Sequence, residues 1–345
     1  MAFDIFQYMG QHQHQEIHFV HDHATGLRGI IAIHNTFRGP ALGGTRLWQY
    51  AKTDEALVDV LRLSEGMTYK AAAVGLPLGG GKAVILADGK ESDPTLRAAR
   101  FEAFGAFVAS LDGRFITAED IGTTTNDIVV MHRRTTHVVG MPDVGGDPSP
   151  VTAHGVLCGM QAMIEGVLDT DSFTDMPIAI QGLGKVGMSL AKLLMERGAT
   201  ITATDVRPET RNEAKKLGIT IVTPKQIYDV PCMIFAPCAL GGILNDETIP
   251  RLRCKIVAGS ANNQLAEAHH AEMLQVREIS YAVDYIINAG GLINVAVELE
   301  GYDQQRAMHK VDAIYDTIKL ILQRSRGQGI TTAQAGWELA AERLH

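Results

Sequence analysis

Gly182-Leu183-Gly184-Lys185-Val186-Gly187 is the stretch that indicates the fold, because an apolar run (177–180) precedes it and a helix-like segment beginning at Met188 follows it. In a strand–turn–helix unit the first glycine permits the tight turn, the second lets the backbone approach a pyrophosphate, and the third lets helix and strand pack closely. The phosphates then lie at the helix N-terminus, where the dipole favours negative charge. The pattern alone is weak evidence, since glycine turns before helices are common.

The next strand-like run strengthens this interpretation. Thr200-Ile201-Thr202-Ala203-Thr204 ends in Asp205, about 20 residues after the first glycine of the turn. A carboxylate there would accept hydrogen bonds from the adenosine ribose hydroxyls and repel the 2′-phosphate of NADP. Arg207 would soften that preference, and helix or strand capping is the alternative role for Asp205. The unit therefore predicts a dinucleotide site that uses NAD.

Composition narrows the class of protein. The chain has 345 residues, of which 46% are hydrophobic and 20% charged, with a net charge of −8. This length exceeds that of one ordinary core, which predicts two domains, and the negative charge argues against nucleic acid or an acidic membrane as a partner. The N-terminal residues 1–4 lack the features of a signal peptide, and the sequence shows no apolar run long enough to cross a bilayer, so we expect no membrane partner and a cytoplasmic location.

Cysteine and histidine give no sign of a metal site. The four cysteines lack a C-x-x-C spacing, which excludes a zinc knuckle and a disulfide framework, and we expect buried thiols. They are Cys158, Cys232, Cys238 and Cys254. A cluster of histidines near the N-terminus has no matched carboxylates, so we interpret it as a surface or edge strand and predict no metal. Its members are His12, His14, His18, His21 and His23.

Turn residues concentrate in the segment 140–150, where we place a hinge between domains. Strand-like runs at 30–34 and 83–86 flank a helical stretch at 54–67 that Thr53 would cap, and a second helical stretch covers about 95–110. Beyond the hinge a helical pattern (151–167) leads into strands and helices in alternation, with strands at 233–236 and 256–258. Two amphipathic helices, separated by Gly327-Gln328-Gly329, end the chain.

This order predicts an α/β protein of two domains. Residues 1–140 would form the substrate-binding and catalytic domain, and residues 141–324 the NAD-binding Rossmann domain. The C-terminal helix, at about 325–345, would pack back on the first domain. Closure about the hinge is the expected catalytic motion.

Two lysines in the first half are candidates for chemistry. Lys70 closes the first helical stretch, and Lys82 follows three glycines and precedes an apolar strand. Three glycines would let the backbone pass close to a small ligand, and a lysine partly removed from water has a lowered pKa and can act as a general base. A surface lysine beside a flexible loop is the alternative. Ala83 excludes a Walker A loop, which needs Ser or Thr after its lysine.

Asp120 is the candidate partner of a lysine. It follows the strand-like run 114–117, and functional side chains of open α/β sheets gather at strand ends. A turn residue before Gly122 is the alternative reading of this carboxylate.

Several separated motifs together resemble the glutamate, leucine, phenylalanine and valine dehydrogenase superfamily, most closely its leucine dehydrogenase branch, over nearly the whole chain. The motifs are Gly39–Arg46, Gly66–Lys70, Gly79–Lys82, Thr117–Gly122, Pro148–Thr152, the glycine turn, Ala236–Gly241, Gly259–Gln264 and Asn288–Asn294. The resemblance implies an N-terminal α/β domain for substrate and oligomerisation, a C-terminal Rossmann domain, and a cleft that separates them. It also implies a homo-oligomer, from dimer to octamer.

The resemblance implies reversible NAD-dependent oxidative deamination of an L-amino acid to its 2-oxo acid and ammonia. Lys70 would hold the substrate carboxylate beside the backbone of Gly43 and Gly44. Lys82, kept partly unprotonated, would activate water, and Asp120 would exchange protons with the amino group and the carbinolamine.

The cofactor residues follow from the same resemblance. Thr152 would bind the nicotinamide carboxamide, and Asn262 and Asn288 would bind the nicotinamide ribose or the substrate, with strand-end capping as the alternative for both asparagines. The full implied set is Thr152, Gly182, Leu183, Gly184, Lys185, Val186, Gly187, Met188, Asp205, Arg207, Cys238, Ala239, Asn262 and Asn288.

The side-chain pocket implied by the resemblance consists of Leu42, Ala118, Leu292 and Val295, all aliphatic. Such a pocket favours a branched-chain substrate. Leu292 replaces the valine expected in the leucine branch, and phenylalanine and tryptophan dehydrogenases share nearly all other motifs. A hydrophobic pocket discriminates one methylene by only about 1–3 kcal/mol, so an aromatic substrate stays open. A non-catalytic NAD-binding sensor is the alternative of a different class.

Overall fold

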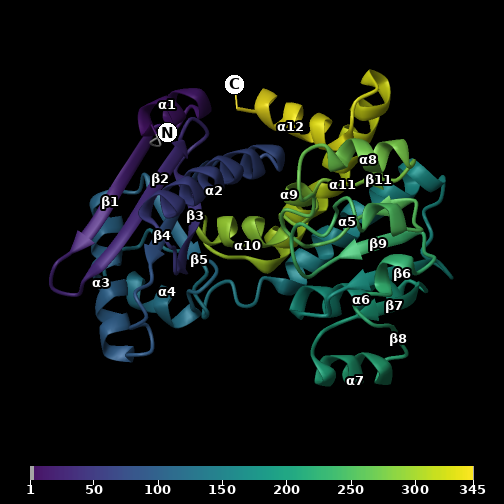
Figure 1. Ribbon diagram of the computed structural model, residues 1–345, viewed down its shortest axis with the longest axis horizontal. Coiled ribbons are helices and arrows are strands. Elements are labelled where there is room, and N and C mark those ends of the chain that lie inside the picture. The colour runs from purple at the N-terminus through teal and green to yellow at the C-terminus, as the bar shows by residue number, and fades with distance from the viewer. Residues whose placement is uncertain (1–3, 345) are drawn as a thin grey trace. The chain divides into compact units, whose positions relative to one another are not determined.

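The computed structural model describes residues 4–344 and divides into two compact α/β units (Figure 1). The first unit runs to Gly146 and includes the segments 298–302 and 340 onward, and the second comprises Asp147–Val297 and Asp303–Leu339. Residues 1–3, which entered the expectation about location, and residue 345, the end of the predicted C-terminal helix, lie outside the described residues.

The first unit is built on a five-stranded mixed sheet with strand order β1-β2-β4-β3-β5. Its first three strands in that order pair antiparallel, while β3 pairs parallel with both β4 and β5. Its elements in chain order are α1 (Ile5–His12), β1 (Glu16–Asp22), β2 (Leu27–Asn35), β3 (Ala41–Trp48), α2 (Thr53–Ala73), β4 (Gly79–Leu86), α3 (Pro94–Ser110), β5 (Phe115–Glu119) and α4 (Thr125–His132).

Helices cover both faces of this sheet, as the alternation of side chains along β2 requires. Ile31 and Ile33 point into a core that includes Phe104 of α3. Ile30 points to the opposite face, where Val60 of α2 completes a second core. A continuous apolar run such as residues 30–33 is typical of a sheet buried on both sides.

Three local predictions for this unit are corrected by the structure. Thr53 lies inside α2 rather than capping it; Lys52 holds the cap position without a side-chain hydrogen bond. His12 belongs to α1, and His14 is buried with its Nε2 atom 3.0 Å from the Leu61 carbonyl. His18 does lie on β1, an edge strand. A buried contact with α2 therefore takes part of the histidine cluster away from the surface.

The second unit is built on a six-stranded parallel sheet with strand order β11-β10-β9-β6-β7-β8. Its first elements in chain order are α5 (Ser149–Leu168), β6 (Pro177–Gln181), α6 (Lys185–Glu196), β7 (Thr200–Thr204), α7 (Pro208–Lys216), β8 (Thr220–Ile221) and the 3₁₀ turn η1 (Ile227–Asp229). The remaining elements are β9 (Ile234–Pro237), η2 (Ile249–Arg251), β10 (Ile256–Val257), α8 (His270–Val276), β11 (Ser280–Tyr281), α9 (Asp284–Ile287), α10 (Gly290–Glu298), α11 (Gln304–Gln328) and α12 (Thr332–Glu342).

Helix α5 is the apolar helix at the centre of this unit. By length and composition it is the one helix among residues 4–344 that meets the criteria for crossing a membrane, contrary to the expectation that no apolar run is long enough. More than half of it is buried inside the unit, where it packs against α6 and α11. Its apolar character is accounted for by this burial, as in the core helix of a folded domain.

The C-terminal segment differs from the predicted division of domains. Residues 325–339 belong to the second unit, and the part from Ala340 onward belongs to the first. The start of α12 is attached locally: Thr332 donates its hydroxyl hydrogen to the Tyr281 carbonyl at 2.6 Å, and Gly336 lies against Val283. Arg343, near the chain end, instead donates to the Ala73 carbonyl of the first unit.

Cysteine burial also differs from the prediction. All four cysteines are free thiols, but only Cys232 and Cys254 are buried, whereas Cys158 and Cys238 are partly exposed.

Candidate active site

Lys82 and Asp120 form a buried ion pair in the first unit. The Lys82 ammonium, on β4, lies 3.1 Å from Asp120 Oδ1, at the end of β5. The Asp120 backbone N–H donates to Thr123 Oγ1 at 2.8 Å, and that hydroxyl also donates to the Thr45 carbonyl at 3.0 Å. The turn after β5 is thereby attached to β3, which holds the carboxylate in place.

Glycine on β3 allows this close approach. A Cβ on Gly44 would lie 2.6 Å from the Glu119 carbonyl oxygen and 2.9 Å from Asp120 Cβ. On β4, a Cβ on Gly80 would meet the Thr68 backbone of α2 at 2.1 Å, and one on Gly81 the Phe115 ring at 2.8 Å. The sequence predicted that the three glycines let a small ligand approach. At Gly80 and Gly81 the structure shows a different reason, because a side chain there would collide with protein atoms.

Burial and charge move the two pKa values in the same direction. Burial lowers the pKa of Lys82 below its usual range, although the Asp120 carboxylate opposes the shift. Burial raises the pKa of Asp120, but the positive charges of Lys82 and Arg46 and their hydrogen bonds outweigh it, so its pKa falls below the usual range. A lysine held this way is closer to its neutral form at physiological pH than an exposed one, while its partner stays ionised.

Arg46 is a site residue that the sequence reasoning did not single out. Its Nε donates to Asp120 Oδ2 at 3.0 Å and its NH1 to Asp59 Oδ2 of α2 at 2.9 Å. The Tyr50 hydroxyl donates to the same Asp59 oxygen at 2.6 Å. A signal was present, because an arginine in an otherwise buried strand needs charged partners. Asp120 is thus bound by two cations, one on each carboxylate oxygen.

Replacing Arg46 with glutamine is expected to lower kcat/KM at least about tenfold, the cost of one charged hydrogen bond. The Arg46 charge lowers the pKa of Lys82 and of Asp120, so its loss raises both. With Lys82 as the predicted base, the acid limb of the pH–kcat/KM profile should move to higher pH. Arg46→Lys, which keeps the charge but not the forked geometry, should retain the wild-type limb with reduced kcat.

Arg62→Gln on the exposed face of α2 is the matched control and should leave both quantities unchanged. An unshifted profile in Arg46→Gln would show that Arg46 serves only to hold the fold.

The other residues predicted for the first unit lie on β3, β5 and α2. Leu42 and Gly43 are buried on β3, Ala118 is half-buried on β5, and Lys70 is half-buried in the last turn of α2. Because β3 pairs with β5 at Gly44 opposite Ala118, the two strands bring the small residues together beside the ion pair.

The residues predicted to bind cofactor in the second unit gather at one edge of its parallel sheet. Gly182 follows β6, Asp205 follows β7, Cys238 follows β9, Asn262 follows β10 and Asn288 follows β11. These are the carboxyl ends of parallel strands, where open α/β sheets bind ligands. The helix after the first of these turns, α6, begins at residue 185, so the remaining members of the glycine turn lie at a helix N-terminus.

The glycine turn has the shape that a pyrophosphate requires. Gly182 has a φ of +97°, and a Cβ on Gly187 would lie 2.1 Å from the Gly182 carbonyl oxygen. A Cβ on Gly184, in contrast, would have no atom of residues 4–344 within 4 Å apart from its own chain neighbours. The turn therefore closes on itself at its ends and leaves open space at its middle glycine, as expected where a phosphate approaches the backbone.

Single alanine substitutions at Gly187 and Gly184 should have different effects, one on stability and the other on dinucleotide binding. Gly187→Ala is expected to destabilise the protein by about 1–3 kcal/mol through overpacking, measured by chemical unfolding. Gly184→Ala should leave the unfolding free energy unchanged and weaken dinucleotide binding, measured by titration calorimetry, because only the ligand's space is filled. Equal affinity in Gly184→Ala and wild type would contradict the placement of the pyrophosphate.

Asp205 is buried and already engaged. Its Oδ2 accepts the Leu183 backbone N–H at 2.8 Å, and its Oδ1 accepts the Arg207 backbone N–H at 2.9 Å. The half-exposed Arg207 side chain adds an ion pair at 3.2 Å. Burial raises the pKa of Asp205, yet these hydrogen bonds and the Arg207 charge bring it below the usual range. The carboxylate stabilises the glycine turn and retains lone pairs for ribose hydroxyls.

The structure also brings together the residues predicted near the nicotinamide. Asn288 donates its amide hydrogen to Asn262 Oδ1 at 2.6 Å. A Cβ on Gly290 would meet the Thr152 backbone at 2.7 Å, so the first turn of α5 lies against the start of α10. Leu292 and Val295, predicted for the substrate pocket, follow on α10. They belong to the second unit, whereas their predicted pocket partners belong to the first.

A parallel sheet with a dinucleotide turn at its carboxyl edge, together with a second α/β unit carrying a buried lysine–carboxylate pair, defines the class of two-domain nicotinamide-dependent dehydrogenases. The sequence pattern described as "Glu/Leu/Phe/Val dehydrogenase, dimerisation domain" matches residues 12–137, and "Glutamate/Leucine/Phenylalanine/Valine dehydrogenase" matches residues 204–339. The chain belongs to the Glu/Leu/Phe/Val dehydrogenase family and is an amino acid dehydrogenase, an oxidoreductase acting on CH–NH₂ groups.

Relatives of this chain carry different substrate names. A leucine dehydrogenase of Thermoactinomyces intermedius is 49% identical, with 99% of this chain and 93% of the relative covered. A phenylalanine dehydrogenase of Caldalkalibacillus thermarum is 46% identical, with 96% and 91% covered. The crystal structure of L-tryptophan dehydrogenase from Nostoc punctiforme has a TM-score of 0.89 and 43% identity, with 99% and 98% covered. The α/β fold and the family predicted from the sequence are confirmed.

Proposed function

We propose that this chain catalyses reversible, NAD-dependent oxidative deamination of branched-chain L-amino acids, namely leucine, isoleucine and valine, to the 2-oxo acid and ammonia. The observation that carries the proposed chemistry is the buried ion pair of Lys82 and Asp120, in which the ammonium and the carboxylate oxygen are 3.1 Å apart. The pair offers one group that can give up a proton and one that can accept it, with Lys82 buried and Asp120 partly exposed.

The pair has two tasks in the proposed reaction. Asp120 takes a proton from the substrate ammonium, which frees the nitrogen lone pair to form an imine as the Cα hydride leaves. NAD, when bound, supplies the acceptor for that hydride. Neutral Lys82 then takes a proton from water as its oxygen adds to the imine carbon, and passes that proton to solvent. Asp120 returns a proton to the nitrogen, and as ammonia leaves, Lys82 takes the hydroxyl proton of the carbinolamine, which becomes the carbonyl of the 2-oxo acid. Lys70 holds the substrate carboxylate throughout as a fixed positive charge.

Aliphatic pocket residues support a branched-chain substrate. Leu42 is buried on β3, and Ala118, Leu292 and Val295 are also aliphatic, so the implied set contains no aromatic or polar side chain. A leucine side chain would be bound by removing its methyl groups from water, and no polar group in this set would select an indole.

Initial rates with single amino acids test the proposal, followed by the near-ultraviolet absorbance of reduced nicotinamide. We expect kcat/KM to be highest for leucine, isoleucine or valine. Leu292→Val should raise the relative rate with larger side chains, because it returns one methylene of space, worth about 1–3 kcal/mol. A higher kcat/KM for phenylalanine or tryptophan in the wild type would overturn the branched-chain assignment and leave the amino acid dehydrogenase activity standing.

The preference for NAD rests on Asp205. Its ionised carboxylate lies at the end of the strand that would meet the adenosine ribose, where it would repel a 2′-phosphate. Arg207, half-exposed beside it, opposes this effect. We expect a lower KM for NAD than for NADP, with a larger difference in Arg207→Ala; equal use of both cofactors would contradict the proposal.

A homo-oligomer is also proposed, since residues 12–137 match a dimerisation domain. Sedimentation at several concentrations tests it, and a monomer throughout would contradict it.

A further inference from the structure

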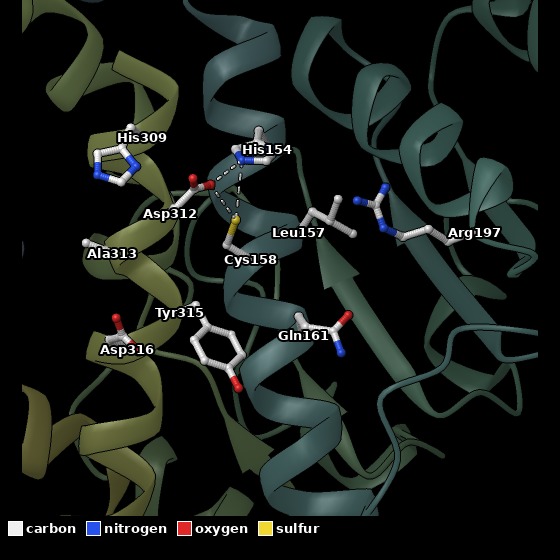
Figure 2. Close-up of a pocket in the computed structure, with 10 residues that line it drawn as sticks. All are labelled: His154, Leu157, Cys158, Gln161, Arg197, His309, Asp312, Ala313, Tyr315 and Asp316. Carbon is white, nitrogen blue, oxygen red and sulfur yellow. Dashed lines mark hydrogen bonds and ion pairs between the residues drawn. The ribbon is translucent and has the colours of Figure 1, made fainter. Parts of the chain in front are cut away.

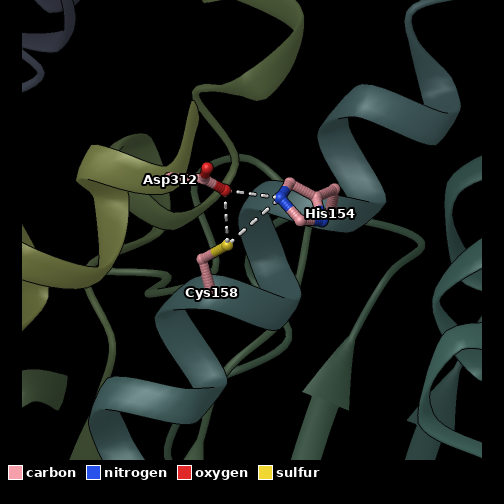
Figure 3. A group of neighbouring side chains, drawn as sticks. All are labelled: His154, Cys158 and Asp312. Atoms are coloured by element: carbon pink, nitrogen blue, oxygen red, sulfur yellow. Dashed lines mark hydrogen bonds and ion pairs between the residues drawn. The ribbon is translucent and has the colours of Figure 1, made fainter. Parts of the chain in front are cut away.

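A second cluster of reactive side chains lies in the second unit, between α5 and α11. His154 and Cys158, one helical turn apart on α5, face Asp312 of α11 (Figure 3). The distance from His154 Nε2 to Asp312 Oδ1 is 2.7 Å, and the Cys158 sulfur lies 3.5 Å from that nitrogen and 3.7 Å from that oxygen. Three different donor atoms therefore converge on one point.

The cluster opens into a pocket of about 510 Å³ (Figure 2). His309 and Asp316, one turn before and one turn after Asp312, line the same pocket, and Arg197 lies at its other side. Thr152, predicted to contact the nicotinamide, is separated from His154 by about 200° around the same helix. The cluster is thus distinct from the dinucleotide edge of the unit.

We propose that His154, Cys158 and Asp312 bind a divalent transition metal ion of the zinc class. In a tetrahedral zinc site with the usual bond lengths, ligand atoms are separated by roughly 3.4–3.6 Å. The 3.5 Å sulfur–nitrogen distance falls in this range, and the 3.7 Å sulfur–oxygen distance lies just above it. Only the nitrogen–oxygen pair must open, and the Asp312 side chain, 56% exposed, has room to turn by that amount.

The donor set selects the kind of ion. A thiolate and an imidazole favour zinc, cobalt or copper over magnesium and calcium, which prefer oxygen ligands. On binding, the Cys158 thiol releases its proton to solvent, and the neutral His154 ring carries its one hydrogen on Nδ1, so that the Nε2 lone pair faces the ion in place of the hydrogen bond with Asp312. Three protein ligands and an open pocket leave the fourth position for water. The ion would tie α5 to α11.

A hydrogen-bonded His154–Asp312 pair without any ion is the competing account of the same geometry. A second group of potential ligands among residues 4–344, Asp246, His269 and His270, lacks a thiol, and its histidine nitrogens lie 3.5–3.6 Å from one carboxylate oxygen. Metal binding at the two groups can be distinguished by spectroscopy, because only the first group supplies a sulfur ligand.

The sequence prediction of no metal site overlooked this cluster. His154 and Cys158 have helical spacing, but Asp312 lies 154 residues after Cys158, and packing of α11 on α5 creates the site.

Cobalt and zinc titrations of the full-length protein test the proposal. We expect one Zn²⁺ per chain by calorimetry, a raised melting temperature with Zn²⁺, and, with Co²⁺, a near-ultraviolet sulfur-to-metal charge-transfer band with the visible bands of tetrahedral cobalt. Cys158→Ser should remove the charge-transfer band, and Cys158→Ser and Asp312→Asn should each weaken Zn²⁺ binding at least about tenfold. Asp312→Asn alters a mostly exposed side chain and should preserve the fold.

His269→Ala with His270→Ala is the matched control and should leave the cobalt spectrum unchanged. Absence of a thiolate band in the wild type, binding unaffected by Cys158→Ser and Asp312→Asn, or binding lost only in the control variant would each overturn the proposal. None of these readouts depends on turnover of an amino acid.

Discussion

Lys82→Ala is expected to reduce kcat about 10³-fold, within the range that a positioned general base contributes. Lys82 is buried on β4 with its ammonium 3.1 Å from Asp120, and burial lowers its pKa. Alanine removes the group that would take the proton from water, and no other lysine is paired with Asp120 in residues 4–344. Steady-state rates with leucine and NAD measure the loss.

Dinucleotide affinity should be unchanged in this variant, because the glycine turn and Asp205 belong to the other unit. Lys52→Ala, at the exposed start of α2, controls for loss of a positive charge and should keep wild-type turnover. Near-normal kcat in Lys82→Ala would remove Lys82 from the chemistry.

Asp120→Asn is expected to abolish turnover to a similar degree and also to destabilise the protein by about 3 kcal/mol, since it leaves two cations without their shared anion. Lys82 and Arg46 approach its two carboxylate oxygens at 3.1 and 3.0 Å. Urea unfolding followed by circular dichroism measures the stability. Asp112→Asn, an exposed residue before β5, is the matched control.

The loss of stability in Asp120→Asn should depend on pH. Asp120 raises the pKa of Lys82, so its removal moves the Lys82 pKa further below the unfolded value of about 10.5. Between these two pKa values the unfolded chain binds more protons than the folded one, and stability therefore rises with pH. The deficit relative to wild type should be larger at neutral pH than at alkaline pH. A deficit that is constant with pH would show that the loss of Asp120 leaves the folded pKa of Lys82 unchanged.

Acid should destabilise the wild type through Asp120 itself. The folded pKa of Asp120 lies below its unfolded value, so its contribution to stability is complete above the unfolded pKa and is lost as the pH falls through the folded one. Asp120→Asn lacks this titrating carboxylate, so its free energy of unfolding should fall less steeply with acid than that of the wild type.

Local patterns in the chain were sufficient for the architecture of the second unit. Alternating apolar runs and helical stretches predicted strands at 177–180 and 200–204, and the structure has β6 and β7 there. The glycine spacing predicted the turn between β6 and α6. These features depend on neighbouring residues alone, which is why they can be recognised without knowledge of long-range contacts.

Short and unusual elements were harder to recognise. The motif 39–46 overlaps most of β3, which lies between β4 and β5, but two glycines in the motif make the strand hard to recognise from the sequence. Helix α4 has only eight residues and a capping box at Thr124, and its periodicity is too short to stand out.

Residue types and their order along the chain thus established the α/β class, the dinucleotide turn, and Lys82 and Asp120 as candidates for proton transfer. Only the tertiary structure showed which charged residues these side chains contact. Arg46 binds Asp120, 74 residues away in the sequence, and Asp312 binds His154, 158 residues away. Periodicity and turn chemistry act between residues close in sequence, whereas these ion pairs depend on strand register and helix packing, which no short stretch of sequence contains.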